Sequence, residues 1–303
     1  MDWFLQQLIN GLALGSIYAL IALGYTMVYG VLRFINFAHS DVLMLGAFAA
    51  YFIAPAVGRL LPPQTLVSAF AITLAAAAIC AVIGILIELL AYRPLRNRPK
   101  LTVLITAIGV SLFIEFTCQH RAVFGAETKP FPKLLPHHDF HLGNLTMDSN
   151  DMVVLGLTAA LLGLLWFIVQ RTKVGTAMRA VAFNPQAAAL MGVDINRIIS
   201  FTFGLGSALA GVAGVLYAMK ASGIEPLMGI QPGLRAFIAA VLGGIGSLPG
   251  AALGGLLLGL LETFAGGTPA ISNYRDGIAF AILILILLVK PSGLLGKTQT
   301  EKV

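Results

Sequence analysis

Long apolar runs separated by short polar loops set the pattern of this chain. The long runs cover residues 3–31, 65–91, 101–119, 152–169, 198–219 and 251–266. Each is about the length that a helix needs to cross the roughly 30 Å hydrocarbon core of a bilayer. A shorter run at 278–289 follows Arg275 and Asp276, which places this charged pair at the outer interface or beside a water-filled cavity.

The stretch from residue 33 to 52 is apolar at both ends and polar in its middle. A new helix is predicted to begin in the polar part, with Asn36 or Ser40 as its cap. A helix N-terminus inside the membrane points N–H groups at an anion such as a carboxylate. We therefore expect translocation-path residues here, with a polar turn at the surface as the alternative. They are Asn36, His39, Ser40 and Asp41.

A second interruption is predicted near the C-terminal third. Residues 234–242 form a short apolar segment that ends in the glycine-rich run 243–250. The segment is either a broken or re-entrant helix or a full span closed by a tight turn. We therefore predict an all-α, polytopic transmembrane bundle of eight to ten spans, with residues 1–303 as one domain. The proline-rich stretch 54–63 and residues 220–232 are predicted to be loops.

Basic residues give the predicted bundle an orientation. Residues 92–100 carry four positive charges, and residues 171–197 carry four more. By the positive-inside rule both loops face the cytoplasm. Two runs lie between them, and an even number of spans returns the chain to the same side. Residues 120–150 are then an external loop.

Composition narrows the class of protein. Hydrophobic residues make up 58% of the chain and charged residues 11%, and the mean hydropathy of +0.91 excludes an ordinary soluble globular protein. Lysines and arginines in the loops account for the net positive charge, so a nucleic-acid partner is not needed to explain it. Cys80 and Cys118 both lie inside apolar runs, so neither indicates a disulfide or a metal site.

Candidate chemistry of other kinds is weak. The histidine-rich run 137–141 could bind a metal, but we favour a solvated external loop and expect no metal. Residues 296–298 match the end of a P-loop, yet Pro291 stands where the upstream glycine belongs. No catalytic residue is expected, because His39 is the only histidine near membrane depth. No cofactor is expected either.

A short self-contained helix is predicted inside the second cytoplasmic loop. Asn184 suits the N-cap, Pro185 the first helical position and Gly192 the position after the helix. The helix 185–191 has about two turns, too few to cross a membrane and marginal alone in water. It therefore needs a partner surface for its small apolar side chains, which are Ala187, Ala188, Ala189, Leu190 and Met191.

This loop carries a family resemblance. The run Gln186-Ala187-Ala188, followed by Gly192, resembles the EAA-type coupling loop of ABC importer permeases, with Gln in place of the usual Glu. Residues 35–41 and 243–250 are similar to two further motifs of one family. The chain is thus similar over nearly its whole length to the branched-chain amino-acid permeases of the LivH type.

The resemblance implies a transmembrane permease subunit of an ATP-driven importer of leucine, isoleucine and valine in the bacterial inner membrane. It implies three kinds of partner besides membrane lipid: a second, LivM-type permease subunit, two ATP-binding subunits and a periplasmic amino-acid-binding protein. In that family the short helix docks into a cleft on an ATPase subunit. The chain itself is then not an enzyme. Glu115 and Glu262 join the candidate path residues, with paired structural charges as the alternative.

Three rival readings stay open at this point. The first is a permease of the same architecture for another small solute, such as urea, an amide or a sugar. The second is a stand-alone secondary transporter, which predicts paired carboxylates at mid-membrane, whereas the acids here lie near helix ends. The third is an intramembrane enzyme, which needs a metal-binding or serine–histidine constellation within the membrane.

Overall fold

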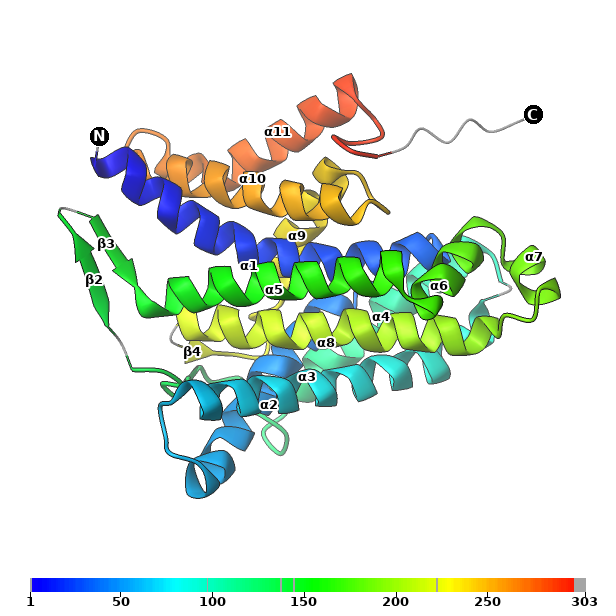
Figure 1. Cartoon of the computed structure of the whole chain (residues 1–303), viewed down its shortest axis with the longest axis horizontal. Coiled ribbons are helices and arrows are strands. Elements are labelled where there is room, and N and C mark those ends of the chain that lie inside the picture. Colours follow the sequence, from blue (N-terminus) through cyan, green and yellow to red (C-terminus); the bar gives the residue numbers. More distant parts are fainter. Residues whose placement is uncertain (1, 97, 137, 144, 222, 297–303) are drawn as a thin grey trace.

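The structure is a computed structural model that describes residues 2–96, 98–136, 138–143, 145–221 and 223–296. Within these residues helices dominate (Figure 1). Eight of the described helices are long and apolar enough to cross a membrane: α1 (Asp2–Leu32), α2 (His39–Leu60), α3 (Leu66–Ile87, continued by the π-turn η1, Glu88–Tyr92, and the 3-10 turn η2, Arg93–Leu95), α4 (Lys100–Gln119), α5 (Ser149–Arg171), α8 (Ile195–Ala221), α10 (Leu248–Gly267) and α11 (Arg275–Val289, preceded by the 3-10 turn η3, Ser272–Tyr274). The prediction of an all-α polytopic bundle is confirmed.

The two ends of the bundle carry different elements. Strands β2 (Asp139–Leu142) and β3 (Leu145–Asp148) form an antiparallel hairpin at one end, where α1 also begins. The side chain of Gln6 joins the two by donating to the carbonyl oxygen of Thr146 at 2.8 Å. Helices α6 (Lys173–Phe183) and α7 (Pro185–Leu190) lie at the opposite end (Figure 1). We call these the hairpin end and the α7 end.

Hydrogen bonds tie together the loops that the charge pattern assigns to one side. At the α7 end, Arg96 donates to the side-chain oxygen of Asn196 at 2.8 Å. At the hairpin end, the short strands β1 (Lys129–Pro130) and β4 (Gly223–Ile224) pair antiparallel. Loops 92–100 and 171–197 therefore share one end, and residues 120–150 lie at the other.

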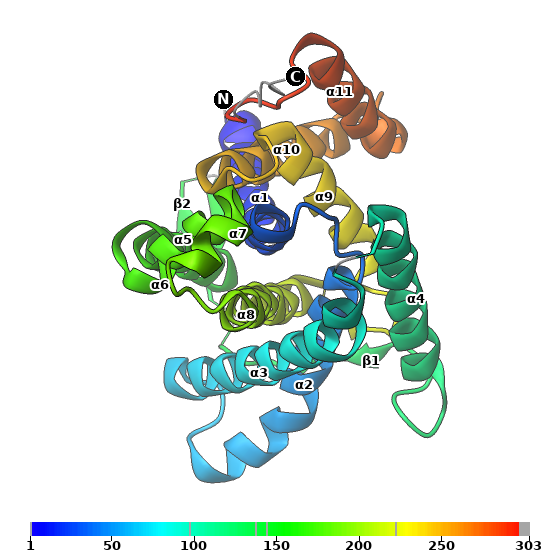
Figure 2. The ribbon, with the colours of Figure 1, turned by 90° about the vertical axis from the view of Figure 1, so that its right-hand side faces the viewer.

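Helix α1 is the centre of the packing. Figure 2 shows it enclosed by α5, α8, α9 (Ile230–Gly243) and α10. Most of its apolar stretch is buried inside the protein, whereas α4, α5 and α11 are largely exposed. Because lipid or another subunit must cover the exposed helices, the core of this chain is organised around α1.

The first interruption folds back into the membrane. After α1 ends at Leu32, residues 33–38 turn inward, and α2 begins at His39 against Gly24 of α1. Gly24 lies about 12 Å from the end of α1, given the rise of a helix. Helix α2 therefore starts inside the bundle, where the irregular backbone before it is shielded from lipid by protein.

The second interruption meets the first. Helix α9 begins at Ile230, four positions before the predicted apolar segment, and spans only part of the membrane. A side chain on Gly229 or Gly233 would collide with Ser40 at the start of α2. Within the stretch 220–232, predicted as an external loop, the chain therefore enters the bundle from Gly229 onward, and the broken-helix alternative is the correct one.

Two local predictions were wrong. The stretch 54–63 is not a loop, because α2 continues through Pro55 to Leu60. A proline in a membrane helix leaves one carbonyl without its helical donor, and neighbouring groups compensate. Residues 173–183, treated as part of a loop, form α6, capped by Thr172, whose side chain accepts from the amide of Gly175 at 3.1 Å.

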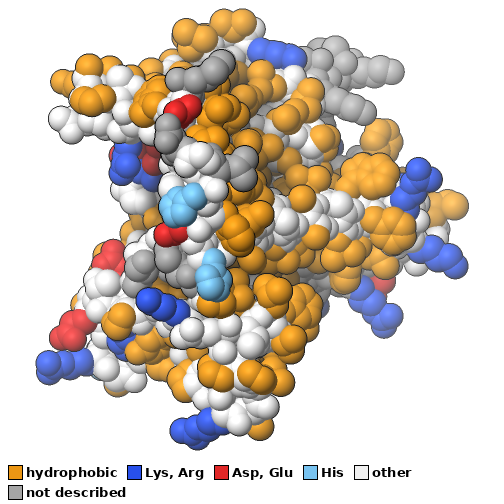
Figure 3. All heavy atoms as spheres, turned by 60° about the vertical axis from the view of Figure 1, so that its left-hand side comes forward, with side chains coloured by type: hydrophobic (Ala, Val, Ile, Leu, Met, Phe, Trp, Pro, Cys, Tyr) orange, Lys and Arg blue, Asp and Glu red, His pale blue; other side chains and the backbone are white. Residues whose placement is uncertain are grey.

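Surface chemistry separates the ends from the flanks. Figure 3 shows charged and histidine side chains gathered on the hairpin end, with hydrophobic side chains covering the flank. Basic side chains also gather at the α7 end. They are Arg33, Arg93, Arg96, Arg98, Lys100, Arg171, Lys173, Arg179, Arg197 and Lys290.

Candidate functional site

Helix α7 forms as its caps predict. Asn184 has an extended backbone, and its side chain accepts from the amide of Ala187 at 3.0 Å. Gly192 adopts a φ of +83°, a conformation that favours glycine. The amide of Val193 donates to the carbonyl of Ala188 at 3.1 Å, closing the helix in a Schellman motif.

The exposed face of α7 is apolar. Leu190 is 90% exposed and Met191 84% exposed, while Ala188 is buried. Phe183, the last residue of α6, is 89% exposed beside them in the chain. Gln186, Ala187 and Ala189 are also exposed. We call Phe183, Leu190 and Met191 the tip patch, and they sit on the outermost elements of the α7 end (Figure 1).

The loop that carries the tip patch is joined to the first interruption. Arg33, the first residue after α1, donates to the carbonyl oxygen of Ala182 at 3.3 Å. Its backbone has a φ of +55°, which is uncommon for a residue with a side chain. The segment that leads from Arg33 to the start of α2 therefore touches α6 directly.

Most of the predicted path residues come together at the start of α2. Asn36, His39 and Asp41 are almost completely buried there, and Ser40 is buried next to them. Tyr92 donates to the side-chain oxygen of Asn36 at 2.6 Å, which ties η1 to the interruption. The Ser40 hydroxyl donates locally, to the carbonyl of Phe37. None of these polar groups faces lipid.

Asp41 connects this cluster to α4. The Ser111 hydroxyl donates to its carboxyl group at 2.5 Å, and Glu115, one turn further along α4, interacts with the same group. This pairing of Asp41 with Glu115 brings five of the six predicted path residues into one region.

His39 packs against α1, and one of its ring nitrogens has no hydrogen-bond partner among the described residues. Its ring packs on the ring of Tyr25, with centroids 4.6 Å apart, and against Gly24, where a methyl group would collide with it. The Nε2 atom is buried without a hydrogen-bond partner among the described residues. His39 therefore fills a tight contact between α1 and α2.

Glu262, the sixth predicted path residue, lies in a different cluster. Tyr18 donates to its carboxylate at 2.8 Å, and Arg235 forms an ion pair with it at 2.8 Å. Arg235 also pairs with Asp276 of α11 at 2.8 Å. Four helices, α1, α9, α10 and α11, thus meet at one guanidinium group.

A third charged cluster anchors the α7 end. Glu88 is completely buried and pairs with Arg93 at 3.0 Å and with Arg96. Ser200 of α8 donates to the same carboxylate at 2.7 Å. Burial lowers the pKa of the Arg96 guanidinium below its ordinary value, while the Glu88 carboxylate opposes that shift. The cluster fixes the end of α3 to α8.

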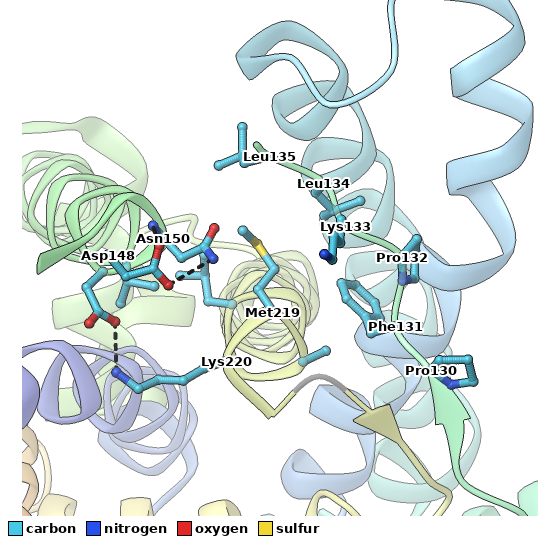
Figure 4. Close-up of a pocket in the computed structure, with 14 residues that line it drawn as sticks. Pro130, Phe131, Pro132, Lys133, Leu134, Leu135, Asp148, Asn150, Met219 and Lys220 are labelled. Atoms are coloured by element: carbon cyan, nitrogen blue, oxygen red, sulfur yellow. Dashed lines mark hydrogen bonds and ion pairs between the residues drawn. The ribbon is translucent and has the colours of Figure 1, made fainter. Parts of the chain in front are cut away.

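A cavity of about 560 Å³ opens at the hairpin end (Figure 4). One wall is polar and contains Asp148, Asn150 and Lys220. The opposite wall is mainly apolar, with Phe131 and Leu134 beside Lys133. The described residues contain no group of three or more possible metal ligands, and His137 of the predicted histidine run lies outside them.

Several residues of these clusters escaped the sequence analysis. Arg235 could have been identified from the sequence, because a single charge inside an apolar run is costly in a membrane unless it has a partner. Phe183 gave a weaker signal as the end of an amphipathic run whose buried positions are Gly175, Met178 and Val181. Tyr18 and Ser111 gave none, because only the fold brings them to their acidic partners.

Comparisons with known proteins agree with the architecture. A family model described as the permease component of branched-chain amino acid transport systems matches residues 7–287. The high-affinity branched-chain amino acid transport system permease protein BraD of Pseudomonas aeruginosa is 42% identical over 99% of this chain and 98% of its own length. The corresponding protein LivH of Escherichia coli is 41% identical over the same shares. The ribose import permease protein RbsC of Haemophilus influenzae is 31% identical, over 41% of this chain and 40% of its own length.

Proposed function

The chain belongs to the family of permease components of branched-chain amino acid transport systems, and we propose that it forms part of the transmembrane path of an ATP-driven importer of leucine, isoleucine and valine. The protein is a multi-pass membrane protein. Its membrane is proposed to be the bacterial inner membrane. Its proposed partners are a second permease subunit, two ATP-binding subunits and a periplasmic amino-acid-binding protein.

The orientation of the chain follows from its charges. Arginines and lysines gather in the short loops of the α7 end, which the positive-inside rule assigns to the cytoplasm. Loops 92–100 and 171–197 are then cytoplasmic, and residues 120–150 face the binding protein. The cavity at the hairpin end lies on that outer side.

The observation that carries the proposal is the tip patch. Three large apolar side chains stand exposed on a basic end of the molecule, where the core of this chain does not cover them. An apolar patch of this kind marks a surface for a protein partner. An ATP-binding subunit that grips α7 would transmit its motion through α6 and Arg33 to the interrupted helices.

A permease for another small solute is the second candidate. The similarity to a ribose import permease over two fifths of the chain favours it. The same coupling surface would serve either solute. Uptake of labelled leucine and labelled ribose by the same membrane vesicles, each competed with the other solute, distinguishes the two.

Substitution of Leu190 by Asp tests the coupling surface. We expect the variant to insert normally, because this side chain has almost no contacts to lose, but to lose co-isolation with the ATP-binding subunit. Leucine uptake should fall by at least about tenfold, since an apolar anchor of an interface contributes on the order of 2 kcal/mol.

Leu60→Asp is the matched control, because Leu60 is 84% exposed at the hairpin end. It should co-isolate with the ATP-binding subunit as the unmodified chain does. Full co-isolation and uptake by the Leu190→Asp variant would contradict the assignment. Ala188→Asp is unsuitable for this purpose, because Ala188 is buried and its substitution would disturb the packing of α7.

A further inference from the structure

The two carboxylates that hold Arg235 differ in their surroundings. Glu262 is buried on α10 and is also held by the hydroxyl of Tyr18. Asp276, at the start of α11, has a side chain that is 55% exposed, and it accepts from Nη2 of Arg235 at 2.8 Å. Tyr18 and Glu262 engage Nη1, so they fix the guanidinium group whether or not Asp276 stays in place.

This ion pair lies at membrane depth. Arg235 donates at 3.0 Å to the hydroxyl of Tyr18, which lies near the middle of α1, about 20 Å along the helix axis from either end. Helix α9 also begins against Ser40, inside the bundle. An exposed carboxylate at such a depth is unfavourable in lipid, so Asp276 faces water, a partner subunit or a passing solute.

We propose that Arg235 and Asp276 together receive the charged head group of the transported amino acid. The carboxylate of the solute takes the place of the Asp276 carboxylate on Nη2 of Arg235, and its ammonium group pairs with the released Asp276. A zwitterion carries no net charge, so the exchange leaves the charge of the cluster unchanged. The inference rests on the proposed function and adds the residues that receive the head group of the solute.

The surface beside the pair suits an apolar side chain. Ile230 and Leu234 lie one turn apart on α9 and are both exposed, and Leu234 directly precedes Arg235. A leucine bound by its head group at Arg235 can lay its side chain on these residues. A neutral sugar has no group that replaces either partner of the ion pair, so this site discriminates between the two candidate solutes.

Ligand-observed saturation-transfer NMR tests the receptor. The complex is isolated through a tag on this chain, placed in nanodiscs and studied without the binding protein, with empty nanodiscs as the blank. The probes are leucine and 4-methylpentanoate, which keeps the carboxylate and the carbon skeleton but lacks the ammonium group. The variants are Arg235→Gln and Asp276→Asn, with Arg275→Gln as the control of equal charge change at the neighbouring position.

We expect leucine affinity to fall by about tenfold in Arg235→Gln and Asp276→Asn, the size expected for one lost charge-assisted hydrogen bond, and to stay unchanged in Arg275→Gln. The carboxylate probe should behave differently. It should bind more strongly to Asp276→Asn than to the unmodified complex, because Nη2 of Arg235 then has no competing carboxylate from Asp276, and should not bind to Arg235→Gln. A purely structural ion pair would not weaken leucine binding and strengthen 4-methylpentanoate binding in the same Asp276→Asn variant.

Equal leucine affinity in the unmodified complex and in Asp276→Asn overturns the inference, whatever happens to thermal stability. Asp276→Asn decides the matter even where Arg235→Gln fails to assemble, because it removes only an exposed group. Leucine uptake by the unmodified transporter distinguishes a failure of the proposed function from a failure of this receptor. Absence of that uptake contradicts the proposed function, whereas uptake with unchanged binding in the variants contradicts only the receptor.

Discussion

Single glycines set how closely the central helices approach. Gly15 of α1 and Gly259 of α10 face each other, and a methyl group on Gly259 would collide with the backbone of Gly15. Gly11 and Gly255 extend the same contact along both helices. Small residues allow this approach because membrane helices gain stability from close van der Waals packing.

The change Gly259→Ala should therefore destabilise the protein by about 1–3 kcal/mol, the usual effect of overpacking a tight contact. Gly163→Ala is the matched control, because no atom lies within 4 Å of a methyl group at this helical glycine. Thermal unfolding in detergent should show a lower Tm for the first variant only. Equal melting of both variants would contradict a close α1–α10 contact.

Interrupted helices link the tip patch to the interior of the bundle. The segment 33–38 begins at Arg33, which contacts α6, and ends at His39, where α2 meets α9 through Ser40. A displacement of α6 therefore has a short covalent route to the region where most of the predicted path residues lie. An irregular segment buried in protein can carry such a displacement, because it has few helical hydrogen bonds to break.

Removal of the Arg33 side chain tests this route. Arg33→Ala should leave ATP hydrolysis intact but lower the leucine uptake per ATP by about 2- to 30-fold, the range for substitutions along a coupled network. Arg197→Ala removes the same charge at the same end, from a side chain that is exposed and paired with the nearby Asp194. This control should transport normally, and an unchanged ratio in Arg33→Ala would remove the segment from the coupling route.

Element positions could be predicted from the sequence where the signal is local. The apolar runs, the caps at Asn184 and Gly192 and the polar break at residues 36–41 all depend on near neighbours along the chain. The encounter of Ser40 with Gly229 could not be predicted, because it joins residues nearly 190 positions apart and leaves no periodic pattern. The α2 extension through Pro55 was missed because membrane helices tolerate a proline that would end a helix in water.

The candidate site was predictable to a similar degree. Buried polar residues at the start of α2 stand out in an apolar chain, and five of the six expected path residues do share one region. Glu262 was grouped with them by residue type alone. In the structure Glu262 pairs with Arg235 instead, and only the packing of α1, α9, α10 and α11 determines that partner.

The whole molecule has two chemically distinct ends joined by an apolar flank. Basic loops and the tip patch occupy the α7 end, and the hairpin end carries mixed charges around the cavity of Figure 4. Helices α4, α5 and α11 are poorly covered by this chain alone. This arrangement suits one permease subunit that is completed in the membrane by a second and driven from the α7 end.

Accessibility of the tip patch tests the central claim most directly. Met191→Cys is introduced after the two buried cysteines, Cys80 and Cys118, are replaced by alanine, and membranes of both orientations are treated with a membrane-impermeant maleimide. We predict labelling in inverted vesicles, protection when the ATP-binding subunit is present, and no labelling in intact spheroplasts. Labelling from the outside, or equal labelling with and without the ATP-binding subunit, would contradict the claim that an intracellular motor grips this patch.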